Sequence, residues 1–167
     1  MKNISEKMID GLNGQITAEF ESAYLYLSMA DYLQARGFSG MARWFRAQAN
    51  EEKAHALKIN DFMISRHVTP DLGEIKAPPK SWRNVIALFD GAYRHECQIS
   101  DRIYDLVAQG MDDRDFAGLS FLQQYVDEQV EEEAQALGWL EKARRSDASP
   151  TGLAMLDEQM GSRRGRG

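Results

Sequence analysis

Cysteine and proline are both scarce in this chain of 167 residues. A single cysteine, Cys97, excludes an internal disulfide and any metal site built from several cysteines. The four prolines leave residues 1–69 and 80–149 free of proline, and proline-free stretches of this length favour helix. β-Branched residues are sparse, so no strand pattern competes with that prediction. We therefore expect an all-α fold.

An excess of positive charge and long apolar runs are also lacking. The formal net charge of −6 argues against non-specific binding to nucleic acid. No apolar run is long enough to span a membrane, and the first fifteen residues lack the apolar core of a signal peptide. We expect a cytoplasmic protein with neither a nucleic-acid nor a membrane partner.

Turn-forming residues divide the two proline-free blocks into helices. Gly37 before Ser39, and Gly110 before Asp112, each predict the end of one helix and the start of the next. The pair Ser149–Pro150 predicts the N-cap and first residue of a short last helix. The expected helices span residues 5–35, 39–66, 82–109, 113–145 and 150–159.

The connection lengths predict the topology. The first and third links are short, so each joins an antiparallel pair of helices. The middle link of about fourteen residues can reach ~46 Å, and the second helix is only ~42 Å long. The link can therefore run the whole length of a bundle and make the second and third helices parallel. We expect one domain over residues 1–160, a ferritin-like four-helix bundle with one long crossover and a short fifth helix, followed by a flexible basic tail at 161–167.

Polar residues interrupt the apolar stripe of each long helix near its midpoint. The stripes are traced in alternating steps of three and four residues, the spacing of one helix face. Helix midpoints meet in a bundle, so the interrupting side chains are expected in one layer of the core. They are Glu19, Glu52, Glu96 and Gln129, with His55 and Glu132 one turn further along the second and fourth helices.

This layer carries more negative charge than a protein core tolerates. Its four glutamates sum to −4, and no lysine or arginine lies on the four stripes. A buried carboxylate without a partner loses several kcal/mol of solvation. Either the carboxyls are protonated or cations lie between them, and two divalent metals would cancel the charge. Oxygen ligands with one imidazole suit iron or manganese, with zinc as a competitor.

The polar layer is also internally repeated. Adding 77 to residue numbers 19, 52 and 55 gives 96, 129 and 132. The pattern Glu19…Glu52-x-x-His55 is thus matched by Glu96…Gln129-x-x-Glu132. Di-iron bundles use a glutamate from each of two helices and Glu-x-x-His from the other two. The first half of the pattern is complete, whereas the second half differs at two positions.

Four sequence blocks resemble the non-haem ferritins of prokaryotes. They are AEFESAYLY (18–26), NEEKAH (50–55), YRHE (93–96) and FLQQYVDEQVEEE (121–133). The resemblance implies a hollow homo-oligomeric shell, usually of 24 subunits. It also implies a ferroxidase that oxidises ferrous iron with O2 or H2O2 and stores the ferric product as a mineral.

The same resemblance implies a role for individual residues. Glu19, Glu52 and His55 would hold one iron, and Glu52 would bridge to a second iron held by Glu96 and Gln129. Tyr26 resembles the redox-active tyrosine of the family. A third iron site on the cavity side would use the acidic residues Glu51, Glu128, Glu131 and Glu132.

Three other functions remain open at this stage. A haem-containing bacterioferritin would carry a methionine ligand where this chain has Lys53, so no haem is expected. A di-iron oxidase or peroxidase without storage would share the metal site but not the shell. A purely structural bundle would leave the carboxylates of the layer unexplained. Of the remaining histidines, His67 and His95 are expected to be surface groups.

Overall fold

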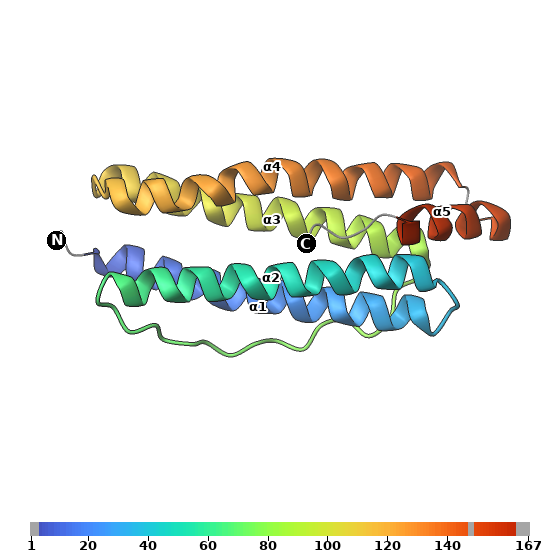
Figure 1. The fold of residues 1–167 in the computed structure, drawn as a ribbon, viewed down its shortest axis with the longest axis horizontal. Coiled ribbons are helices and arrows are strands. Elements are labelled where there is room, and N and C mark those ends of the chain that lie inside the picture. Colours follow the sequence, from blue (N-terminus) through green and yellow to red (C-terminus); the bar gives the residue numbers. More distant parts are fainter. Residues whose placement is uncertain (1–3, 147–148, 163–167) are drawn as a thin grey trace.

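The protein is an elongated bundle of four long helices with a short fifth helix at one end (Figure 1). The computed structural model describes residues 4–146 and 149–162. Over these residues the predicted all-α fold is confirmed, with the expected number of helices. They are α1 (Glu6–Gln34), α2 (Ser39–Ser65), α3 (Val85–Asp112), α4 (Phe116–Arg145) and α5 (Pro150–Ser162).

The long crossover, residues 66–84, runs along the outside of α1 (Figure 1). Three hydrogen bonds fix its course: from the Asp71 amide to the Asn13 side chain at 3.0 Å, from the Lys76 amide to Glu21 at 3.2 Å, and from the Ser28 hydroxyl to the Pro79 carbonyl at 2.6 Å. The crossover returns the chain to the end of the bundle where α2 begins. Helices α2 and α3 are therefore parallel, and the predicted ferritin-like arrangement is confirmed.

Side-chain caps define the beginnings of three helices. The Ser5 hydroxyl accepts from the Met8 amide at 3.1 Å, and the Asn84 side chain accepts from the Ala87 amide at 2.8 Å. Ser149 does the same for α5 by accepting from the Gly152 amide at 3.1 Å. Each cap satisfies a backbone N–H that has no partner within its own helix. The predicted cap at Ser149 is thus confirmed.

The boundary between α3 and α4 lies further along the chain than the sequence predicted. Gly110 is buried inside α3 and does not end it, and α4 begins at Phe116. The turn is made by Arg114, which adopts a positive φ of 52°. Asp115 gives α4 no side-chain cap, because its carboxylate accepts two hydrogen bonds from the Arg66 guanidinium, at 3.1 and 3.3 Å. α3 likewise begins three residues after the predicted start at 82.

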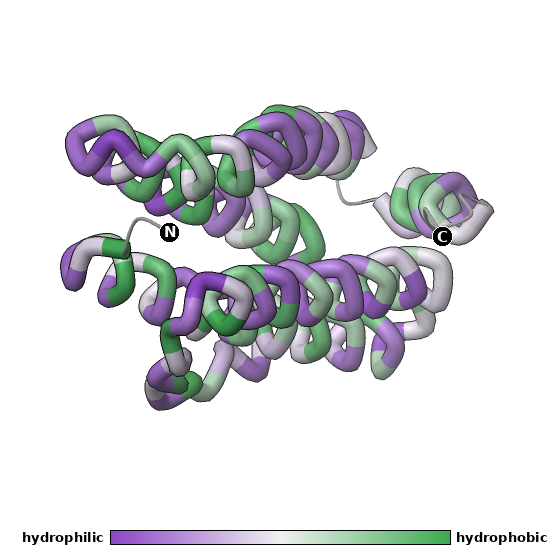
Figure 2. The backbone as a smooth tube through the Cα atoms, turned by 60° about the vertical axis from the view of Figure 1, so that its left-hand side comes forward, coloured by the Kyte–Doolittle hydropathy of each residue, from purple (hydrophilic) through white to green (hydrophobic). Residues whose placement is uncertain are grey.

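The hydrophobic core is divided into two clusters. One cluster contains Tyr26, Phe45 and Phe89 and lies at the end of the bundle where α5 packs. The other contains Ile16 and Ile103 and lies at the opposite end. Apolar and polar residues alternate along each helix, as expected for helices with one buried face (Figure 2). The layer of buried polar side chains lies between the two clusters.

Helix α5 docks on the start of α2 through two glycines. A Cβ at Gly40 would lie 1.9 Å from the Asp157 carbonyl oxygen, and Gly161 lies against the Gly40 backbone. The Asp157 carboxylate accepts from the Met41 amide at 2.8 Å and so caps α2, which has no cap of its own. The helix continues to Ser162, two residues past the expected domain boundary. Residues 163–167, the rest of the expected tail, lie outside the described residues.

Replacing Gly40 by alanine is expected to lower the free energy of unfolding by about 1–3 kcal/mol, because the added methyl group overlaps backbone atoms of α5. Gly138→Ala is the matched control, since a Cβ at Gly138 meets nothing within 4 Å. It should stabilise α4 by roughly 0.5–1 kcal/mol. Chemical denaturation of both variants measures the difference. Equal stability of the two variants would contradict this account of α5 docking.

None of the helices described has the length and apolar character needed to cross a membrane.

Candidate metal centre

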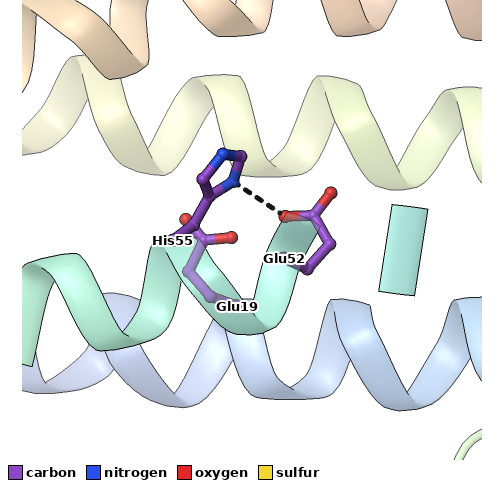
Figure 3. Close-up of side chains that lie close together, drawn as sticks. All are labelled: Glu19, Glu52 and His55. Atoms are coloured by element: carbon purple, nitrogen blue, oxygen red, sulfur yellow. Dashed lines mark hydrogen bonds and ion pairs between the residues drawn. The ribbon is translucent and has the colours of Figure 1, made fainter. Parts of the chain in front are cut away.

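Glu19, Glu52 and His55 form a compact group in the middle of the bundle (Figure 3). One ligand atom from each residue lies within 4.8 Å of those of the other two. Glu19 comes from α1, whereas Glu52 and His55 lie one turn apart on α2. The His55 Nδ1 atom is 3.2 Å from Glu52 Oε2. Side chains from two helices are thus close enough together to bind one metal ion.

Glu96 and Gln129 form the second half of the layer, from α3 and α4. The Gln129 Nε2 atom lies 3.3 Å from Glu96 Oε2, and it also donates to the Glu96 carbonyl and the Ser100 hydroxyl, each at 3.3 Å. The Tyr26 hydroxyl donates to Glu96 Oε1. The structure thus brings the five predicted residues of the di-iron pattern, and the predicted tyrosine, to one level of the bundle.

Burial keeps the three carboxyls of this layer from ionising easily. Glu19, Glu52 and Glu96 are only 1%, 4% and 3% exposed. Burial raises the pKa of each of them from 4.5 to about 8. Nearby negative charge adds to the effect: Glu52 raises the pKa of Glu19, and Glu132 raises the pKa of both Glu52 and Glu96. Cations in this layer would reverse the effect and hold all three carboxylates ionised.

The Glu19 carboxylate fits a metal ligand in a second respect. Its Oε1 atom accepts a hydrogen bond from Gln15 at 2.8 Å, whereas its buried Oε2 atom meets no N–H donor among the described residues, and the Glu52 carboxyl is the group beside it. A buried oxygen of this kind is costly unless a donor or a cation meets it. With two further carboxylates and an imidazole beside it, the group of donors suits iron, manganese or zinc.

The four glutamates predicted for the third site lie outside the buried layer. Glu128 is half-buried, and its Oε2 atom lies 3.4 Å from His55 Nε2, while Lys58 Nζ is 4.0 Å from its other oxygen. Glu132, which was expected to point inward, is only half-buried and accepts from Gln48 at 3.2 Å. Two more acidic residues were predicted for a third site. Glu51 is half-buried, and Glu131 is exposed.

Four polar partners of these residues were not predicted. Three of them lie four residues, or one helical turn, from a glutamate of the layer: Gln15, Gln48 and Ser100. That spacing is the sequence signal that could have identified them. The fourth is His95, and its expected place at the surface is wrong. His95 lies 2.7 Å from the Ser22 hydroxyl and edge-on to the Tyr26 ring, with centroids 5.9 Å apart. Burial lowers the pKa of His95 to about 4, which keeps the imidazole neutral.

Comparison with known proteins identifies the family. Residues 9–146 match the Ferritin family, described as a ferritin-like domain. A bacterial non-heme ferritin of Bacteroides fragilis strain 638R is 38% identical over 160 residues, which cover 96% of this chain and 99% of that protein. A bacterial non-heme ferritin of Staphylococcus aureus strain MRSA252 is 29% identical over 160 residues, covering 96% of each chain.

Solved structures give the same result. An open pore ferritin from the hyperthermophilic archaeon Archaeoglobus fulgidus is similar with a TM-score of 0.95 and 44% sequence identity, covering 98% of this chain and 100% of that one. The family match extends over most of the bundle, and the similarity to non-haem ferritins extends over nearly the whole chain. The chain belongs to the ferritin family, and the resemblance to prokaryotic non-haem ferritins is confirmed.

Proposed function

We propose that this protein is an iron-storage ferritin that oxidises ferrous iron at the polar layer of its bundle and stores the ferric product inside a hollow shell of 24 subunits. The observation that carries the proposal is the burial of three carboxyls in one layer beside a half-buried imidazole, with one carboxyl oxygen that meets no N–H donor among the described residues. The similar proteins named bacterial non-heme ferritin support it. A purely structural bundle gives no reason for burying three carboxyls in one layer of the core.

The proposed substrate is a pair of ferrous ions held by this layer. Glu19, Glu52 and His55 would hold the first ion, and Glu52 would bridge to the second, held by Glu96 and Gln129. Ligation requires ionised carboxylates, so binding releases the protons that burial keeps on these groups. Each ion then gives one electron to the oxidant. Two electrons with two protons convert O2 to H2O2, and two electrons alone convert H2O2 to two hydroxide ions.

Tyr26 is the proposed source of a further electron when the oxidant requires more electrons than the two ferrous ions supply. Its hydroxyl donates to Glu96 Oε1, so the phenolic proton can pass to that carboxylate as the electron leaves. The neutral His95 ring beside Tyr26 adds no positive charge that would oppose the oxidation.

The outer glutamates are proposed as the path from the centre to the cavity. Glu128 is the first group on that path, since it contacts His55 from outside the layer. With Glu51, Glu131 and Glu132 it would form a third, cavity-side iron site. Three of these carboxylates are half-buried and one is exposed, so they exchange ligands with solvent more readily than those of the buried layer.

Aerobic loading of the apoprotein with ferrous iron tests the storage function. Size-exclusion chromatography followed by iron staining should show one large particle that carries iron. A large shell that takes up no iron would contradict oxidation and storage at this layer. An iron-oxidising species of single-subunit size would instead support a di-iron oxidase without storage.

Gln129→Glu is expected to tighten the second metal site by about tenfold and to slow turnover, because it adds a negative charge and a bridging oxygen where Gln129 now offers a neutral amide. Gln123→Glu adds the same charge at an exposed position of α4 and serves as the control. Anaerobic titration with Co²⁺ followed by calorimetry measures the affinity of each site. Unchanged affinity at the second site would count against the assignment of Gln129 as a ligand.

A further inference from the structure

Gln15 is a fully buried amide with a defined orientation. Its exposed fraction is 0%, and it lies one turn before Glu19 on α1. The Gln15 Oε1 atom accepts from Arg102 Nε at 3.0 Å, and its Nε2 atom donates to Glu19 Oε1 at 2.8 Å. An arginine can only donate hydrogen bonds, so it must face the oxygen of the amide. The amide nitrogen is therefore directed at Glu19.

The helix α1 is built so that Arg102 can reach this amide from α3. A Cβ at Gly14 would lie 3.2 Å from Arg102 Nη2, so a larger residue there would crowd the guanidinium. A glycine inside a helix lowers its stability by about 1 kcal/mol relative to alanine. Gly14 therefore destabilises α1 but leaves room for the Arg102 guanidinium. Arg102 itself is exposed in a groove between α1 and α3. The hydrogen-bonded series Arg102–Gln15–Glu19 thus runs from solvent to the buried layer.

The two oxygens of Glu19 consequently have different environments. Oε1 is held by Gln15, whereas the buried Oε2 meets no N–H donor among the described residues and has only the Glu52 carboxyl beside it. If the carboxylate rotated, its two oxygens would change places, but the Gln15 N–H would still hold whichever oxygen lay beside it. A carboxylate held in this way offers one oxygen to a metal and keeps the other in its hydrogen bond.

We propose that Arg102 and Gln15 are positioning residues that make Glu19 a one-oxygen ligand through Oε2. The inference rests on the proposed function, in which Glu19 binds the first metal. Arg102 fixes the amide orientation of Gln15, and Gln15 prevents the second oxygen of Glu19 from chelating the same ion. This leaves a coordination position open for the oxidant.

The test uses apoprotein and Co²⁺, whose visible absorption reports coordination number without any redox reaction. Gln15→Leu should lower first-site affinity about 10–100-fold, the usual cost of losing a partner of a metal ligand, and should change the Co²⁺ spectrum. Arg102→Ala should do the same to a smaller degree, because the amide can then turn over. Arg94→Ala is the control, since it removes the same charge from α3 but pairs with Asp90 on its own helix.

A double variant separates positioning from simple electrostatics. If Arg102 acts only through Gln15, then adding Arg102→Ala to Gln15→Leu should have no further effect on affinity or spectrum. A further loss in the double variant, or single variants that behave like Arg94→Ala, would overturn the inference. If Gln15→Leu fails to fold, the Co²⁺ spectrum of Arg102→Ala tests the inference alone. Arg102 is exposed, so its replacement should leave the fold intact. Failure of the proposed function itself is distinguishable, since Co²⁺ would then bind equally well to Glu52→Ala.

Discussion

Replacing Glu52 by alanine is expected to lower the initial rate of ferrous iron oxidation by about 100-fold or more. Loss of a group that only supports a metal ligand typically costs 10–100-fold, and Glu52 is proposed to contact both metals. The substitution also removes the carboxylate that lies 3.2 Å from His55, so the imidazole loses a partner as well. Stopped-flow absorbance after mixing apoprotein with ferrous iron and oxygen measures the rate.

The same variant should still assemble. Glu52 is buried among other carboxyls, and burial raises its pKa, so it does not stabilise the apoprotein when ionised. Asp61→Ala removes an acidic residue from an exposed position of α2 and is the matched control. His55→Ala should resemble Glu52→Ala. Wild-type rates in both of these variants would show that the metal centre lies elsewhere.

The stability of the apoprotein is expected to fall as pH rises from 5.5 to 8. The pKa values of Glu19, Glu52 and Glu96 are raised by burial to about 8, above their ordinary value of 4.5. Between these two values the folded state binds more protons than the unfolded state, so the free energy of unfolding decreases with pH. Each group contributes at most about 1.4 kcal/mol per pH unit. Thermal unfolding of metal-free protein at several pH values measures this slope.

Redox-inactive Zn²⁺ should reverse this pH dependence. Binding replaces protons by metal, so it becomes tighter as pH rises. At a free concentration one thousand times its Kd, one metal ion stabilises the folded state by about 4 kcal/mol. That corresponds to a rise in Tm on the order of 10 °C for a chain of this size. Glu96→Gln should flatten the slope of the apoprotein. A Tm of the apoprotein that stays constant or rises over this range would contradict the buried-carboxyl account.

The polar layer was predictable because it depends only on helix midpoints. In a bundle, residues at the same height meet whatever the details of the loops, so Glu19, Glu52, Glu96 and Gln129 could be placed together from their numbers alone. The crossover was predictable from its length for a similar reason. Its extended path along α1 is what makes α2 and α3 parallel.

Features that depend on contacts between helices were not predictable from periodicity. The start of α4 moved because Asp115 pairs with Arg66, which follows the end of α2 and is far away in sequence, and gives no side-chain cap to its own helix. His95 was expected at the surface, but it is held by Ser22 of α1. Arg102 lies on the exposed side of α3 in any helical projection, and its link to the layer exists only through Gln15.

The most direct measurement is the anomalous X-ray scattering of crystals soaked anaerobically with ferrous iron, recorded at the iron absorption edge. The account predicts a strong peak between Glu19, Glu52 and His55 and a second, weaker peak between Glu52, Glu96 and Gln129. The second peak is expected to be weaker because Gln129 supplies no charge. Iron bound elsewhere in the bundle, with no peak in the layer of buried carboxylates, would contradict the central claim.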